Sequence, residues 1–97
     1  MELTDENIFD VTKYGNFLIL AYTDWCPRCL PEAEKLETLE KDSMNFKYAK
    51  FHFQDCPKAT KKFDIITVPT VICMKDGIVQ DIKAGSEIDY YEMLENF

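Results

Sequence analysis

The sequence has neither a long apolar run nor an excess of basic residues. Its longest apolar run is Phe17–Tyr22, whereas a membrane-spanning helix needs about 18–20 such residues. Lys and Arg number 11 against 18 Asp and Glu, which gives a formal net charge of −7. Binding to nucleic acid requires clustered Lys and Arg to meet the phosphates. We therefore expect no nucleic acid and no membrane as a partner.

The first residues also lack the features of a secretory signal. Met1–Glu6 is acidic and polar, whereas a signal peptide needs a basic start followed by an apolar stretch. The chain is therefore either cytosolic or has lost a leader peptide. The initial Met favours the first interpretation, and we expect a cytoplasmic protein.

Histidine and cysteine are too few and too scattered for a structural metal site. The chain has one His and four Cys, of which only Cys26 and Cys29 are close in sequence. A structural zinc site usually takes four ligands in two close pairs, so we expect no metal. A disulfide scaffold is typical of small secreted chains that cannot build an apolar core. This chain is 46% apolar and can build one.

The two isolated cysteines have different predicted environments. Cys73 lies in the apolar run Val71–Met74, which predicts a free thiol in the core. Cys56 falls in a predicted polar loop, where it is either a tolerated thiol without a role or a thiol that forms mixed disulfides or a covalent dimer. His52, the sole histidine, lies on a predicted strand, and we assign it no catalytic role.

Periodicity and turn residues divide the chain into helices and strands within one predicted domain, residues 1–97. The order is helix, strand, helix, strand, helix, strand, strand, helix, over residues 4–13, 17–22, 27–41, 46–53, 57–63, 68–75, 78–84 and from 86 onward. A strand–helix–strand crossover gives parallel neighbours, and Asp76-Gly77 is typical of a hairpin turn. We therefore predict an α/β fold with a central mixed four-stranded sheet flanked by helices on both faces.

Helical spacing also predicts which side chains face the core. In the helix over residues 27–41, Leu30 falls on the apolar face. Glu32 belongs to a group of charged residues that are predicted to lie mostly on the outside. Near the N-terminus, Thr4 is the predicted N-cap and Asp5 lies in the first turn. The last helix is predicted to begin at a Ser86 capping box. Its predicted apolar residues are Ile88, Tyr91, Leu94 and Phe97.

The clearest chemical signal is Trp25-Cys26-Pro27-Arg28-Cys29, where the apolar strand gives way to a helix. Two cysteines at this spacing can close a small disulfide with little movement of the chain. The first lies near the helix N-terminus, where unpaired N–H groups and the helix dipole favour its thiolate. Because the thiolate attacks disulfides, the motif predicts thiol–disulfide exchange, with Cys26 attacking and Cys29 resolving.

Three later segments accompany this motif: Thr67-Val68-Pro69-Thr70, Lys75-Asp76-Gly77 and Gly85. With it, they make almost the whole chain resemble the thioredoxin family, which implies the thioredoxin fold and protein-disulfide reductase activity. The resemblance implies that the bond before Pro69 is cis, that this proline faces the disulfide, and that Val68 offers backbone groups to an extended substrate. Trp25 is predicted to contact the substrate. Some animal members carry an accessory cysteine at the place of Cys56.

The residues between the cysteines depart from the thioredoxin pattern. Common thioredoxins carry Gly-Pro there, whereas this chain has Pro27-Arg28. A proline in the first position also resembles glutaredoxins and periplasmic disulfide oxidases. Arg28 brings a positive charge that should stabilise the Cys26 thiolate, and Asp24 partly opposes it. We expect a couple less reducing than thioredoxin, at about −250 to −180 mV.

A second departure is Leu20, which stands where thioredoxins usually have a buried aspartate that helps to deprotonate the resolving cysteine. The lysine that accompanies this aspartate is retained as Lys50. Without the carboxylate, deprotonation of Cys29 must rely on water, Lys50 or the substrate. Resolution of mixed disulfides should therefore be slower.

We predict an enzyme of cell redox homeostasis that reduces or exchanges disulfides in protein substrates without an organic cofactor. Its electrons would come from a disulfide reductase or a small-thiol donor. Two alternatives remain open. A glutaredoxin-like enzyme would use glutathione, but the segment after Pro69 lacks the Gly-Gly loop and Trp25 is a thioredoxin feature. A thioredoxin-fold binding adaptor is favoured by Leu20 and opposed by the intact Cys26 and Cys29.

Overall fold

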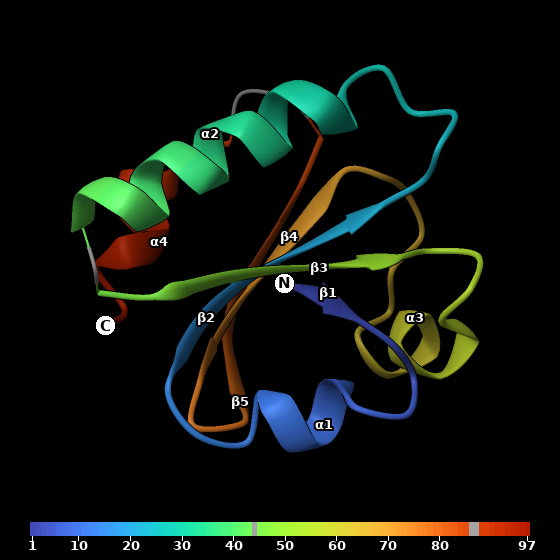
Figure 1. Cartoon of the computed structure of the whole chain (residues 1–97), viewed down its shortest axis with the longest axis horizontal. Helices are drawn as coiled ribbons and strands as arrows, with labels where there is room; N and C mark the ends of the chain where they lie inside the picture. The colour runs from blue at the N-terminus through green and yellow to red at the C-terminus, as the bar shows by residue number, and fades with distance from the viewer. Residues whose placement is uncertain (44, 86–87) are drawn as a thin grey trace.

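The computed structural model describes residues 1–43, 45–85 and 88–97 (Figure 1). The strands are β1 (Glu2–Leu3), β2 (Asn16–Tyr22), β3 (Lys47–His52), β4 (Thr70–Lys75) and β5 (Ile78–Ala84). The helices are α1 (Ile8–Val11), α2 (Cys29–Ser43), α3 (Pro57–Lys62) and α4 (Tyr90–Leu94). Within those ranges, no helix is both long and apolar enough to cross a membrane.

β2 lies at the centre of a mixed sheet with the strand order β1-β3-β2-β4-β5. It runs parallel to β3 and antiparallel to β4, while β1 is parallel to β3 and β5 antiparallel to β4. Helices α2 and α4 cover one face of the sheet, and α1 and α3 cover the other (Figure 1). The predicted α/β arrangement with helices on both faces is therefore confirmed.

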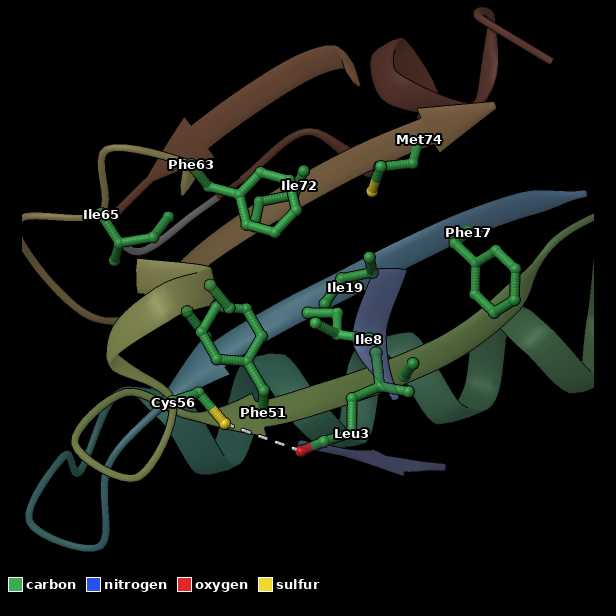
Figure 2. Packing of buried hydrophobic residues seen from close by; sticks show 13 residues of the cluster. Leu3, Ile8, Phe17, Ile19, Phe51, Cys56, Phe63, Ile65, Ile72 and Met74 are labelled. Atoms are coloured by element: carbon green, nitrogen blue, oxygen red, sulfur yellow. Dashed lines mark hydrogen bonds between the residues drawn. The ribbon is translucent and has the colours of Figure 1, made fainter. Parts of the chain in front are cut away.

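The core consists of two buried clusters separated by the sheet, and β2 contributes to both. Phe17 and Ile19 belong to the cluster under α1 and α3 (Figure 2). Leu18 and Leu20 belong to the cluster under α2 and α4. Because side chains alternate across a strand and both faces are covered, every residue from Phe17 to Ala21 is buried, as the unbroken apolar run predicts.

The sheet has five strands where the sequence predicts four. The additional strand, β1, pairs Glu2 with Lys50 and Leu3 with Phe51. Leu3 is 1% exposed and belongs to the cluster in Figure 2. Two residues are too few for an alternating pattern to be visible, so periodicity alone does not reveal this strand.

The first helix begins later than the sequence predicts. The N-cap of α1 is Asn7, and Thr4 precedes a turn. Asp5 does not lie in the first turn of this helix. Its carboxylate instead accepts the backbone N–H groups of Lys58 and Ala59 at 3.0 and 2.9 Å. The negative charge of Asp5 therefore stabilises the N-terminus of α3 and ties the N-terminal segment to that helix.

The strand register brings several connecting segments to one end of the sheet. Tyr22 and His52 are paired where β2 and β3 end. At the start of β4, Thr70 lies between Ala21 of β2 and Ala84 of β5. The segments that follow β2, β3 and β5 and the segment that precedes β4 therefore meet at this end. They include the cysteine motif and the cis-proline segment.

Helix α2 buries a carboxylate that helical spacing predicts to face outward. Glu32 is 2% exposed, whereas Leu30, predicted to face the core, is 65% exposed. The Tyr90 hydroxyl donates to Glu32 Oε1 at 3.0 Å, and Lys35 Nζ lies 3.3 Å from Oε2. Burial, and then this hydrogen bond, raise the pKa of Tyr90, which keeps the hydroxyl protonated. With two donors, the buried carboxylate is satisfied and links α2 to α4.

The inward face of α4 agrees with the prediction only in part. Tyr90 and Met93 are buried, whereas Tyr91, predicted as a core residue, is 74% exposed. The helix N-cap is Asp89, whose carboxylate accepts the Glu92 N–H at 3.2 Å. The predicted cap, Ser86, lies outside the described residues. The other three predicted residues, Ile88, Leu94 and Phe97, are partly buried and pack against the cluster under α2 and α4, as predicted.

The buried Glu32–Tyr90 contact predicts an asymmetric response to mutation. Tyr90→Phe leaves a buried carboxylate with one donor fewer, and should lower the free energy of unfolding by about 1.5–3 kcal/mol. The double variant Glu32→Leu/Tyr90→Phe should recover part of this loss, because neither polar partner then remains unsatisfied. Guanidinium unfolding followed by circular dichroism measures both effects.

The matched control is Tyr91→Phe, which removes an exposed hydroxyl from the same helix. Its unfolding free energy should stay within about 0.5 kcal/mol of the wild type. If Tyr90→Phe were equally neutral, the contact with Glu32 would not be what holds α4 on α2.

Candidate functional site

The two motif cysteines lie in the short connection between β2 and α2. They form a disulfide with their Cα atoms 5.4 Å apart. The connection is compact, because the Cys26 N–H donates to the Thr23 carbonyl at 3.4 Å and the Cys29 N–H donates to the Cys26 carbonyl at 3.2 Å. Cys29 is the first residue of α2. Cys26 therefore lies just before the helix N-terminus, where N–H groups lack helical partners.

The two sulfur-bearing residues differ in their access to solvent. Cys29 is 4% exposed, whereas Cys26 is only half-buried and its neighbours Pro27 and Arg28 are exposed. An incoming disulfide can therefore reach Cys26 more easily than Cys29. The helix N-terminus favours a negative charge on the Cys26 sulfur once the disulfide is reduced.

A pocket of about 720 Å³ lies beside the disulfide, and Cys29 forms part of its wall. Leu20 and Lys50 line it from neighbouring strands, where they are direct partners in the register of β2 and β3. Asp24 and Trp25 line it from the loop. The structure thus gathers Trp25 and Lys50, two of the site residues predicted from the sequence, around the cysteines.

The charged residues that line this pocket do not form a buried carboxylate–lysine pair. Among the described residues that line it, Lys50 supplies the ammonium and Asp24, with a side chain 77% exposed, supplies the carboxylate. Lys50 Nζ lies 5.3 Å from the centre of the Tyr22 ring. The Tyr22 hydroxyl donates to the Glu2 carboxylate at 2.9 Å, and burial followed by this bond raises the pKa of Tyr22. The Tyr22 ring therefore contacts Lys50, while its hydroxyl binds Glu2.

The segment before β4 lies at the same end of the sheet as the cysteine loop. The Val68–Pro69 peptide bond is cis, as the resemblance implies. Val68 is half-buried and Pro69 is buried, and the Pro69 carbonyl accepts the Gly85 N–H at 2.9 Å. Thr70 follows directly and pairs with Ala21 near the end of β2. The polypeptide around the cis bond is therefore anchored to β5 on one side and to β2 on the other.

Large apolar side chains are exposed on segments at this end of the molecule. Trp25 is 83% exposed, Ile66 is 91% exposed, and Leu30 in the first turn of α2 is 65% exposed. Ile66 is not among the site residues predicted from the sequence. Its neighbour Ile65 is buried, and two consecutive isoleucines give no sign in the sequence of which one faces solvent.

His52 contacts the cysteine loop, although the sequence suggests no role for it. Its Nε2 lies 3.3 Å from Asp24 Oδ2. The two residues are 28 positions apart, and the pairing of Tyr22 with His52 in the sheet brings them together. No group of three or more His, Cys, Asp or Glu side chains suited to a metal occurs in the part of the chain that the structure describes.

The remaining two cysteines are free and buried. Cys73 is 0% exposed, which confirms the predicted core thiol. Cys56 is 2% exposed and its Sγ lies 3.8 Å from the Leu3 carbonyl (Figure 2), so it is not an accessible accessory thiol in this structure. Burial raises the pKa of Cys56, and it raises the pKa of Cys73 to about 11. Both thiols are therefore poor nucleophiles at neutral pH.

Comparison with known proteins gives one consistent result. The family model named Thioredoxin matches residues 1–95. The chain is 31% identical to the thioredoxin of Staphylococcus saprophyticus over 86 residues, which cover 88% of this chain and 83% of the relative. It is 26% identical to the thioredoxin of Bacillus subtilis, over 88% of this chain and 83% of the relative.

Solved structures agree in fold. Thioredoxin f2 of Chlamydomonas reinhardtii superposes with a TM-score of 0.87 at 17% identity, covering 99% of this chain and 93% of that one. Thioredoxin f of spinach chloroplast gives a TM-score of 0.85 at 23% identity, covering 99% and 81%. At these identities the likeness concerns the fold alone.

The burial of Cys56 and Cys73 predicts their reactivity. In the oxidised native protein at pH 8, both should react with a thiol reagent such as DTNB at least about 100-fold more slowly than in guanidinium, because little thiolate forms. The unfolded oxidised chain should release two equivalents of chromophore, from the two free cysteines.

Single Cys56→Ser and Cys73→Ser variants identify which thiol reacts. In each variant, the unfolded oxidised chain should release one equivalent of chromophore and not two. A native thiol that reacts at the unfolded rate and disappears in Cys56→Ser would place Cys56 at the surface, contrary to the structure.

Proposed function

Because this chain belongs to the thioredoxin family and is a thiol–disulfide oxidoreductase, we propose that Cys26 is its attacking thiol and Cys29 its resolving thiol. The observation that supports these roles is the difference in exposure. Cys26 is half-buried beside the helix N-terminus, and Cys29 is 4% exposed at the start of α2. A thiolate on Cys26 is both reachable and electrostatically favoured.

In this scheme the reduced protein transfers two electrons to a substrate disulfide in two steps. The Cys26 thiolate attacks one substrate sulfur, forms a mixed disulfide and releases the other substrate sulfur as a thiolate. Cys29 then loses its proton and attacks the Cys26 sulfur. This step forms the Cys26–Cys29 disulfide and releases the second substrate thiolate. Both substrate thiolates take protons from solvent, and the protein leaves oxidised.

Charged residues near the cysteines would tune these steps. Arg28, between the cysteines, favours the Cys26 thiolate, while the carboxylate of Asp24 opposes it. Lys50 lines the pocket of Cys29 beside Leu20, and its ammonium would stabilise the Cys29 thiolate as it forms. Pro27 occupies the position after Cys26, before the first residue of α2, and has no N–H that would need a partner there.

Trp25, Val68 and Pro69 are the residues that we propose to contact the substrate. Trp25 is 83% exposed, and the cis-proline segment ends at the same end of the sheet. The exposed Ile66 and Leu30 would add apolar contacts. Such a surface suits an extended, partly apolar protein segment that carries the disulfide. Electrons would return through a disulfide reductase or a small thiol.

We also propose that residues 1–97 act as one domain, in the cytoplasm and without an organic cofactor or metal. The matched relatives are thioredoxins, and nothing in these matches favours the glutathione-dependent enzyme or the binding adaptor. The family's reaction uses only the two thiols, and each substrate turnover consumes one dithiol.

Trapping of a mixed disulfide tests the roles of the two cysteines. Reduced Cys29→Ser protein, mixed with a disulfide-containing protein such as insulin, should accumulate a mixed disulfide at Cys26, because no thiol is positioned to resolve it. Reduced Cys26→Ser protein should trap little, because Cys29 is 4% exposed. Mass spectrometry after acid quench locates the adduct. Equal trapping by both variants would contradict the assignment.

The missing carboxylate predicts that resolution can be accelerated. Leu20→Asp places a carboxylate in the wall of the pocket that Cys29 lines, next to Lys50. Its carboxylate should take the Cys29 proton and raise the rate of mixed-disulfide release by about 10-fold or more. Stopped-flow fluorescence of Trp25 after mixing with a disulfide substrate follows this step.

Leu20→Asn is the matched control, because it loses the same apolar packing without adding a base. It should release no faster than the wild type. If Leu20→Asp and Leu20→Asn released at the same rate, proton removal from Cys29 would not limit this step.

A further inference from the structure

The only histidine of the chain lies against the loop that carries Cys26. His52 is the last residue of β3, and its side chain is 14% exposed. The ring packs edge-on against Tyr22, with centroids 5.3 Å apart and an interplanar angle of 75°. Its Nε2 lies 3.3 Å from Oδ2 of Asp24. The imidazole is therefore held in one orientation by a ring on one side and a carboxylate on the other.

The contacts of Nδ1 determine which nitrogen carries the proton in the neutral ring. The backbone N–H of Gln54 donates to Nδ1 at 3.3 Å, so Nδ1 is an acceptor. The neutral ring therefore carries its proton on Nε2 and donates it to Asp24. Asp55 Oδ2 lies 3.7 Å from Nδ1. When a second proton binds at Nδ1, the Gln54 bond is lost and Asp55 faces the new N–H.

The charged groups around the ring come from several segments. Asp24 follows β2 and Asp55 follows β3, and both favour the imidazolium. On the Tyr22 ring, Lys50 lies 5.3 Å from the centroid and opposes a second positive charge, while Glu2 accepts the Tyr22 hydroxyl proton. The two aspartates contact the imidazole directly, whereas Lys50 and Glu2 act across Tyr22.

Asp24 links this titrating group to the redox centre. It is two residues before Cys26 and lines the same pocket as both cysteines. The negative charge of the Asp24 carboxylate disfavours a thiolate on Cys26. When His52 is protonated, its positive charge beside Asp24 offsets that effect. The protonated ring therefore favours the thiolate, and a thiolate on Cys26 must in turn favour the protonated ring, because coupling between two sites is reciprocal.

We propose that His52 is a positioning residue that acts through Asp24 to couple a proton to the redox state of the Cys26–Cys29 pair. The proposal rests on the assignment of Cys26 as the attacking thiolate. Oxidation removes the negative charge from the sulfur, so His52 should bind its proton more weakly in the disulfide form. As pH rises and His52 loses its proton, the Asp24 charge is no longer offset and the thiolate is less favoured. The dithiol should then be a stronger reductant than it would be with His52 protonated.

Because the chain has one histidine, its ring signals in a ¹H–¹³C NMR spectrum are unambiguous. His52 should be titrated from pH 5 to 9 in the oxidised and in the reduced protein, with the Cys26 thiolate followed by absorbance at 240 nm. Where the reduced protein carries the thiolate, the affinity of His52 for its proton should be about two- to three-fold higher than in the disulfide form. Equal affinities in the two forms would overturn the proposal.

Two single substitutions test the path through Asp24. Asp24→Asn removes the carboxylate that contacts His52 Nε2. It should abolish the difference in proton affinity of His52 between the two redox states. Asp55→Asn removes the carboxylate on Nδ1 and should leave that difference, although it weakens proton binding in both forms. A redox difference that survived Asp24→Asn would contradict the proposed path.

The outcome is separate from that of the trapping experiment. A protein in which Cys29→Ser traps substrate while His52 titrates identically in both redox states would overturn the coupling alone. A protein with redox-dependent titration and no trapping at Cys26 would overturn the cysteine roles instead.

Discussion

The pairing of β2 with both β3 and β4 is the constraint on which the rest of the structure depends. β2 is buried on both faces, and its two-sided register aligns the end of β3 and the start of β4 with its own end. The chain then needs only residues 23–28 to reach the first turn of α2. This short connection places Cys26 beside a helix N-terminus and Cys29 inside it. The same register delivers Val68–Pro69 and His52 to that end of the sheet.

The chemistry of the site follows from where charge is present and where it is missing. The position opposite Lys50 in the register is Leu20, which cannot accept a proton. Among the described residues, the fully buried carboxylate is that of Glu32, which lies between α2 and α4 and is contacted by Tyr90 and Lys35. The charged residues nearest to Cys26 in the sequence, Asp24 and Arg28, are both exposed. Salt screens exposed charges such as these more strongly than it would screen a buried carboxylate–lysine pair.

Local sequence patterns predicted the features of this protein that depend on residues close together in the sequence. The apolar run of β2, the hairpin at Asp76-Gly77 and the CxxC pair at a strand–helix junction were all visible without a structure. Features that depend on distant contacts were not. Glu32 is buried because Tyr90, 58 residues away, satisfies it, and His52 meets Asp24 only through the register of two strands. The resemblance to thioredoxins supplied the cis bond before Pro69, which no periodicity indicates.

The most direct test of the account is the reduction of insulin by dithiothreitol, followed by turbidity, with the wild-type protein and with Cys26→Ser. The account predicts that the wild type shortens the lag before precipitation and that Cys26→Ser matches the uncatalysed reaction. Cys56 and Cys73 remain in both proteins, so any contribution from them cancels. Acceleration by Cys26→Ser equal to that of the wild type, or by neither protein, would contradict the central claim that the half-buried Cys26 thiolate beside the N-terminus of α2 carries the reaction.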